Sequence, residues 1–215
     1  MEEPAVRAFD KGFEPKQKPG LAGQLDRGMH FDRGKPMDVC GFPAALRKGR
    51  VRMTMDTPRL VIRMASEEEM EAIVEQEADD ELRGAYREML QGCRDHPDQV
   101  PWYAVWLIER KDGTCVGDLC FKGLNDDGSV EIGYGIDEGF RSMGFATEAV
   151  AAAVAWALAQ PNVSRVEAET VPDNHASQRV LEKSGFVPSG IEGEEGPRYV
   201  FVPQGQRKPF LAKDG

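Results

Sequence analysis

The sequence predicts an α/β fold in which helices flank a mixed, mostly antiparallel sheet. Short alternating apolar segments separated by turn residues indicate several antiparallel strands in the middle of the chain. An alanine-rich helical segment, 147–159, then precedes a further alternating segment, 163–171. A helix of that length can return the chain parallel to the strand before it, so one strand pair of the sheet should be parallel.

The expected elements begin with a strand at 59–63 and a helix opened by Ser66. Glu69, three positions later, completes a capping-box pattern, and the helical pattern breaks near Asp79 and resumes to about Cys93. Strands are expected at 102–108, 115–121, 129–137 and 198–202, with turns at 109–113 and 125–128.

The composition divides the 215 residues into three parts. We expect an irregular extension at 1–56, one domain at 57–203 and a polar tail at 204–215. Residues 1–53 carry a net charge of +4 and the remainder carries −14. The alternatives for the extension are a flexible tail or a misassigned start, with the native one at Met53 or Met55.

Charge and cysteine content exclude several classes of function. A formal charge of −10 argues against nucleic acid as a partner, and no run of eighteen apolar residues suggests a membrane span. The start of the chain lacks an apolar signal core, so we expect a cytoplasmic protein with four free thiols. The three histidines are far apart in the sequence and suggest no metal site.

The segment 141–149, Arg-Ser-Met-Gly-Phe-Ala-Thr-Glu-Ala, joins a predicted strand to the alanine-rich helix. Its small residues Gly144 and Ala146 let an anion approach the uncapped amides at the start of a helix, and Arg141 adds a cation. The segment is therefore predicted to bind phosphate.

This order of motifs resembles the GCN5-related N-acetyltransferases (GNAT), in particular their RimJ/RimL branch. The shared pattern is a strand, Arg-x-x-Gly-x-Ala, a helix, a strand, Asn174-x-x-Ser177, a helix and Gly185-Phe186, and it covers roughly residues 57–203. The resemblance implies the GNAT fold and direct transfer of an acetyl group from acetyl-coenzyme A (acetyl-CoA) to a primary amine, without a metal.

The resemblance also implies a cofactor site. Main-chain groups at 136–137 would bind the pantetheine arm, the loop would bind phosphate, and Asn174 would bond the arm where two strands separate. Asn174 could instead be a turn residue bonded to its own backbone. At 142 and 143, relatives commonly carry glycine and a basic residue, which this chain lacks. The implied cofactor-binding residues are Ile136, Asp137, Arg141, Ser142, Met143, Gly144, Phe145, Ala146, Thr147 and Asn174.

Two catalytic residues follow from the resemblance. Glu131, on the strand before the loop, would be the general base, although an ion-paired carboxylate on the sheet face is an equal reading. Ser177 would serve the leaving thiolate, because Leu181 occupies the position where many relatives have tyrosine. Ser177 could also cap its helix or lie in its first turn. Three further glutamates in a predicted loop at 187–197 are kept as candidate bases: Glu192, Glu194 and Glu195.

The expected activity is acetylation of a primary amine, in particular the N-terminal α-amine of a protein or peptide. Two alternatives remain open from the sequence: a small-amine acetyltransferase acting on a polyamine, amino acid or aminoglycoside, and a non-catalytic acyl-CoA-sensing domain. The sequence does not decide whether the protein forms a homodimer.

Overall fold

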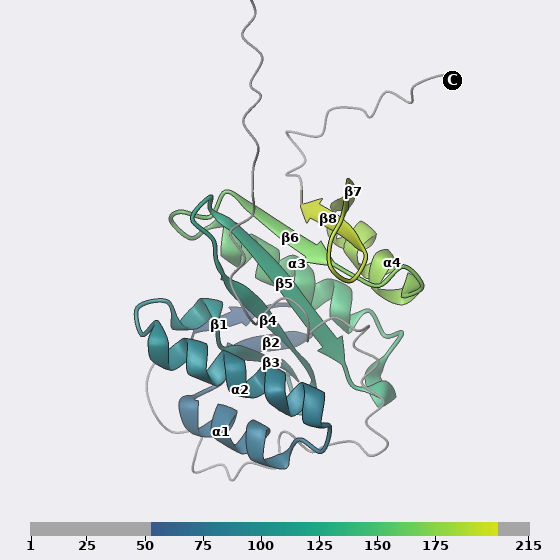
Figure 1. Ribbon diagram of the computed structural model, residues 1–215. Helices are drawn as coiled ribbons and strands as arrows, with labels where there is room; N and C mark the ends of the chain where they lie inside the picture. Colours follow the sequence, from purple (N-terminus) through teal and green to yellow (C-terminus); the bar gives the residue numbers. More distant parts are fainter. Residues whose placement is uncertain (1–52, 202–215) are drawn as a thin grey trace, which may run out of the picture.

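The computed structural model describes residues 53–201, which form one eight-stranded sheet flanked by helices (Figure 1). The strand order is β1-β2-β3-β4-β5-β6-β8-β7. Within these residues every neighbouring pair is antiparallel except β5 and β6, which are parallel, so the predicted mixed, mostly antiparallel sheet is confirmed. The strands are β1 (Thr54–Asp56), β2 (Leu60–Met64), β3 (Val105–Arg110), β4 (Cys115–Leu124), β5 (Ser129–Ile136), β6 (Arg165–Glu169), β7 (Phe186–Glu192) and β8 (Pro197–Phe201).

The helices are α1 (Glu67–Gln76), α2 (Asp80–Asp95), α3 (Phe145–Leu158) and α4 (His175–Ser184), with short 3₁₀ turns at Val100–Trp102 and Glu138–Phe140. The capping box predicted at Ser66 and Glu69 is present, and Asp79 caps α2 at the predicted break. In the described part of the chain, no helix is both long and apolar enough to cross a membrane.

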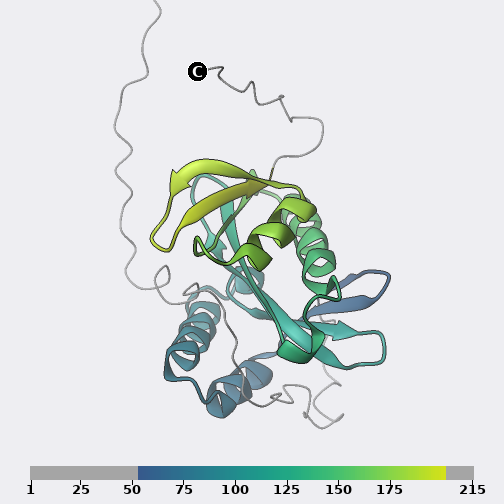
Figure 2. The same ribbon diagram turned by 90° about the vertical axis from the view of Figure 1, so that its right-hand side faces the viewer.

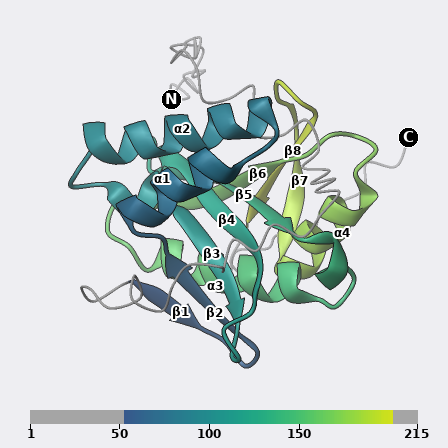
Figure 3. The ribbon, with the colours of Figure 1, turned by 90° about the horizontal axis from the view of Figure 1, so that it is seen from below.

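The helices cover both faces of the sheet (Figures 2 and 3). On one face, α1 and α2 bury Met70, Tyr86 and Met89 against the sheet, together with Leu107 and Cys120. On the other face, α3 and α4 pack against residues that include Trp106, Leu119 and Val130. Successive residues of a strand point to opposite faces. Since Val130 and Ile132 belong to the α3 side, Glu131 and Gly133 face the α1–α2 side.

Two strands lie where the sequence predicted irregular chain. β1 falls inside the stretch 1–56, so the sheet begins three residues before the expected domain boundary, and residues 1–52 lie outside the described range. β7 replaces most of the loop predicted at 187–197. It is an edge strand with nearly every residue exposed, so it shows no alternation, and an edge tolerates Pro188 and Gly190.

Candidate active site

The two parallel strands at the middle of the sheet pair over only three residues. β5 and β6 are bonded from Ser129 to Glu131, after which β5 continues beside β4 and β6 continues beside β8. Figure 1 shows the two strands diverging toward their carboxyl ends. Beyond Glu131, the backbone groups of β5 that face β6 therefore have no partner strand in the described part of the chain.

The register decides which predicted main-chain contacts can bind a ligand. The amide of Asp137 donates to the carbonyl oxygen of Val116 on β4, so this group already has a partner, and binding of a pantetheine arm at Asp137 stays a prediction. Because neighbouring residues of a strand direct their backbone groups to opposite sides, those of Ile136 face the open side. Nε of Arg141 donates to the Ile136 carbonyl oxygen at 3.2 Å, which places this guanidinium beside the end of β5.

The predicted phosphate loop leads directly into α3. Gly144 is the N-cap, with φ 79°, and no side chain caps the helix. Ser142 also has a positive φ, 61°, and residues 142–144 are exposed. Alternating left-handed residues turn backbone amides into one concavity, and the helix dipole adds positive potential there. The side chain of Phe145 is buried in the core, so this residue can bind an anion only through its backbone.

Asn174 and Ser177 form the start of α4. Asn174 is the N-cap, and its Oδ1 accepts the amide of Ser177 at 3.1 Å, so its side chain caps α4 rather than bonding to its own backbone. Ser177 lies in the first turn. Its Oγ is 3.0 Å from the hydroxyl of Tyr134, which reaches it from the open part of β5. Tyr134 was not predicted from the sequence, where its place three residues after Glu131 on the same strand is the only signal.

Tyr134 brings a phenol from β5 to the start of α4, a helix in which Leu181 occupies the position where many relatives have tyrosine. Tyr134 also donates to the carbonyl oxygen of Ser177 at 3.2 Å. Burial raises the pKa of Tyr134 to about 12, in spite of its hydrogen bond with Ser177. The phenol therefore keeps its proton at neutral pH and fixes the position of the Ser177 hydroxyl.

Glu131 is held by two cations. Its Oε1 is 2.5 Å from Nζ of Lys122, and its Oε2 pairs with the guanidinium of Arg198 on β8. The ion-paired reading considered from the sequence therefore describes this structure. Glu131 stays a predicted base, but one cation would have to move away before the carboxylate could accept a proton.

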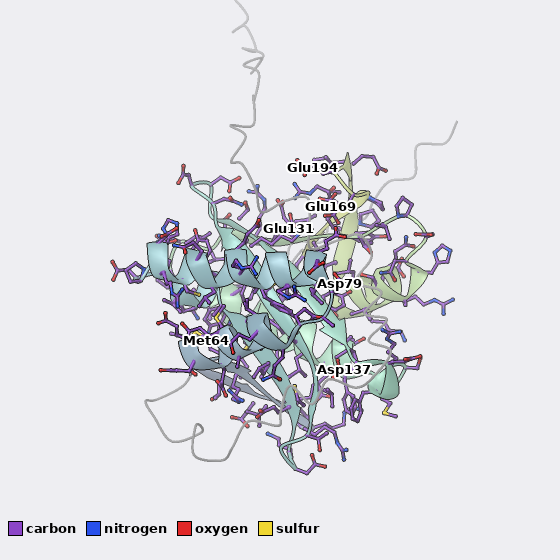
Figure 4. All side chains as sticks on the ribbon, turned by 60° about the horizontal axis from the view of Figure 1, so that its bottom comes forward. Met64, Asp79, Glu131, Asp137, Glu169 and Glu194 are labelled. Atoms are coloured by element: carbon purple, nitrogen blue, oxygen red, sulfur yellow. The ribbon has the colours of Figure 1, made fainter. Side chains whose placement is uncertain are left out.

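The turn between β7 and β8 is held on the carboxyl end of β6 by Glu169. Oε1 of Glu169 accepts the amides of Glu195 at 2.6 Å and Gly196 at 3.2 Å, and its Oε2 lies 3.2 Å from Arg198 Nε. Gly193 lies beneath it, and a Cβ there would lie 2.2 Å from the Glu169 carboxylate, so a larger residue would displace this carboxylate. Figure 4 shows Glu131, Glu169 and Glu194 gathered on one side of the molecule.

Glu195 differs from the other glutamates of this turn. Glu192 and Glu194 are exposed, whereas both carboxylate oxygens of Glu195 are buried and have no hydrogen-bond partner among the described residues. Burial raises the pKa of Glu195 to about 7. The carboxyl ends of parallel strands lie at the same edge of a sheet, so Glu195 at the end of β6 shares an edge with the open half of β5 and the start of α4.

Comparison with known proteins identifies this arrangement. The family model of the acetyltransferase (GNAT) domain matches residues 50–187. The chain belongs to the GNAT acetyltransferase family.

Curated relatives of this GNAT protein are also named as acetyltransferases. It is 29% identical to the uncharacterized N-acetyltransferase YoaA of Bacillus subtilis, over 64% of this chain and 84% of YoaA. It is 39% identical to the uncharacterized N-acetyltransferase YjdG of the same organism, over 38% of this chain. The match with YjdG spans only half of that protein, 50% of its length.

Solved structures share the fold at low sequence identity. The ribosomal L7/L12 α-N-protein acetyltransferase RimL superposes with a TM-score of 0.56 and 17% identity, covering 73% of this chain and 98% of RimL. RimJ of Mycobacterium smegmatis, solved with a CoA-disulfide, gives 0.52 and 20% identity over 69% of this chain and 84% of RimJ. A GNAT acetyltransferase of Bacillus anthracis gives 0.54 and 20%, over 70% of this chain and 98% of that protein.

GNAT acetyltransferases are acetyl-CoA-dependent acyltransferases, and the residues of this member fit that cosubstrate. The exposed loop with uncapped helix amides suits a diphosphate, and the unpaired side of β5 suits an amide-bearing arm. Gly144 leaves the approach to the backbone open.

Proposed function

We propose that this protein transfers an acetyl group from acetyl-CoA to the N-terminal α-amine of a protein or peptide, with Glu195 as the general base. The observation that supports this most directly is the buried, unpartnered carboxylate of Glu195 at the edge where β5 and β6 separate. A carboxylate without hydrogen-bond donors keeps its lone pairs for an incoming ammonium group.

The acidity of Glu195 is suited to an α-amine. Its pKa of about 7 lies close to that of an α-ammonium group, about 7.7–8.0. Proton transfer between these two groups is therefore nearly balanced. A lysine-type ammonium has a pKa of about 10.4, roughly three pKa units above that of Glu195, so its proton transfer to Glu195 is unfavourable. This match favours an α-amine over a side-chain amine or a polyamine.

The remaining residues have roles that agree with amine attack on a thioester. Acetyl-CoA, when bound, supplies the activated acetyl group. Glu195 takes the proton of the attacking ammonium. When the phenol of Tyr134 donates its proton to Oγ of Ser177, the serine hydroxyl keeps its own proton for a hydrogen bond to the departing sulfur. The loop at 141–147 binds the diphosphate through its amides.

The solved neighbours do not select the acceptor. They include the L7/L12 α-N-protein acetyltransferase RimL and a spermidine N-acetyltransferase chimera, which superposes with a TM-score of 0.52 and 17% identity. The choice of acceptor therefore rests on Glu195.

The test is release of free thiol from acetyl-CoA with three acceptors. The first is a peptide with a free α-amine and no lysine, the second is the same peptide blocked at its N-terminus and carrying one lysine, and the third is spermidine. Turnover is expected with the first peptide alone. Equal or greater turnover with spermidine or the blocked peptide would refute the assignment to an α-amine, and turnover with none would refute the proposed function.

A matched pair of variants tests Glu195 in the same assay. Glu195→Gln removes the base, and the control Glu194→Gln changes the neighbouring exposed carboxylate. Activity should fall in the first variant and persist in the second.

A further inference from the structure

Arg59, the residue before β2, lies against the predicted phosphate loop. Its Nη1 donates to the carbonyl oxygen of Met143 at 2.9 Å, and its guanidinium lies 4.8 Å from the ring centroid of Phe145. If Gly144 carried a Cβ, the nearest atom would be Nη2 of Arg59, at 3.4 Å. The guanidinium therefore supports the loop from one side over three consecutive residues.

Glu148, in the first turn of α3, fixes Arg59 in this place. Its Oε2 is 2.6 Å from Arg59 Nε, and its Oε1 accepts both the Arg59 amide at 2.9 Å and the Thr57 hydroxyl at 2.6 Å. Burial would raise the pKa of Glu148, but hydrogen bonds from Thr57 and Arg59 outweigh burial and lower it. The carboxylate is thus a fixed anion beside the loop, and Arg59 neutralises it.

The contact with Met143 has a geometric consequence for the loop. In a planar trans peptide, the carbonyl and the following N–H point in opposite directions. Because Arg59 draws the Met143 carbonyl oxygen toward itself, the amide of Gly144 points away from Arg59. This amide belongs to the exposed N-cap residue of α3, which no side chain caps.

We propose that Arg59 is a positioning residue of the cofactor site, which orients the Gly144 amide toward the diphosphate of CoA. The proposal rests on the proposed function in requiring that this loop binds CoA. Arg59 acts through the peptide between Met143 and Gly144 and through neutralisation of Glu148. Lysine could supply the neutralising charge, but reaching the Glu148 carboxylate and the Met143 carbonyl at once requires a planar fork, which lysine lacks.

The test is the dissociation constant of CoA, measured by calorimetry on the full chain with no amine present. Arg59→Met removes the guanidinium, and Arg59→Lys keeps the charge but not the fork. The matched control is Arg94→Met, because Arg94 also joins two carboxylates, Glu67 and Glu71, and its side chain is 43% exposed against 49% for Arg59.

Arg59→Met should weaken CoA binding by about tenfold or more, the effect of losing one well-oriented bond to a charged group. Arg59→Lys should recover little of this loss, and Arg94→Met should bind as the wild type does. The amide resonance of Gly144 should shift on CoA binding in the wild type and shift less in both Arg59 variants.

Unchanged CoA affinity in Arg59→Met would overturn the proposal. Wild-type CoA affinity in Arg59→Lys would also overturn it, because Arg59 would then act through its charge alone. If Arg59→Met fails to fold, the Arg59→Lys variant decides alone. An affinity of this variant for CoA equal to that of the wild type would refute the proposal. A wild type that binds no CoA would refute the proposed function and this inference with it. A wild type that binds CoA while the variants bind equally well would refute this inference only.

Discussion

Replacing Glu195 by glutamine changes one property of the β7–β8 turn, its ability to ionise. The amide has nearly the same shape as the protonated carboxyl group, and the two backbone amides that hold the turn still bond to Glu169. The variant should therefore fold like the wild type while lacking the proposed base.

The effect on stability follows from the raised pKa. Below pH 4.5 the carboxyl is protonated in both the folded and the unfolded protein, and glutamate and glutamine should be equivalent. Between pH 4.5 and about 7 the unfolded chain ionises first, so the wild type loses stability as the pH rises, and the loss is complete above pH 7. This pKa difference corresponds to at most about 3 kcal/mol, and solvent near this partly exposed residue reduces it to about 1–2 kcal/mol.

Glu195→Gln should therefore be more stable than the wild type by about 1–2 kcal/mol at pH 8 and equally stable at pH 4. Its kcat for a peptide with a free α-amine should fall by roughly a hundredfold or more. The kcat of the wild type should rise with pH to a plateau, with an apparent pKa near 7 that the variant lacks.

The assays are urea unfolding at several pH values and steady-state thiol release across pH 5.5–9, with Glu194→Gln as the control. A variant with the rate of the wild type would refute Glu195 as base. A stability difference that does not change with pH would refute the buried ionisation, and a loss of rate in Glu131→Gln alone would move the assignment to Glu131.

Three further changes test the site and the fold. Tyr134→Phe should lower kcat by about tenfold in the thiol-release assay with little change in KM, because the serine hydroxyl on α4 loses its fixed position; an unchanged kcat would contradict this role. Gly144→Val should cost about 1–2 kcal/mol in urea unfolding and weaken CoA binding, because φ is +79° there; Gly139→Val, where nothing lies within 4 Å, should do neither. Arg63→Met should cost about 3–5 kcal/mol in urea unfolding, because it leaves the fully buried Glu69 without its cation, and a loss below 1 kcal/mol would count against that ion pair.

Much of the fold could be predicted because its signals are local. The capping box at Ser66 and Glu69 involves residues three apart, and the turn at 125–128 closes with the amide of Gly128 bonded to the carbonyl oxygen of Asn125. These interactions form within a few residues, so their pattern is visible in the sequence. β1 and β7 could not be found in this way, because each exists only through pairing with another strand.

The residues of the candidate site also divide into those with local sequence signals and those defined by contacts between distant segments. The loop at 141–147 and the Asn174–Ser177 pair lie in contiguous motifs, so the sequence alone suggests them as site residues. The environment of Glu131 and Glu195 depends on Lys122, Arg198 and Glu169, which the sheet brings together from three strands. The sequence kept both glutamates as candidate bases, and only their surroundings separate an ion-paired carboxylate from an unpartnered one.

The sequence by itself indicated the family through the order of its motifs. It also determined the mixed sheet and suggested a phosphate loop, because periodicity, caps and glycines act over a few bonds. The tertiary structure decided which amides face the open side of β5, that Tyr134 reaches Ser177, and that Arg59 supports the loop from the start of β2. These contacts join residues far apart in the chain. Their formation depends on strand register and helix packing, which no local pattern encodes.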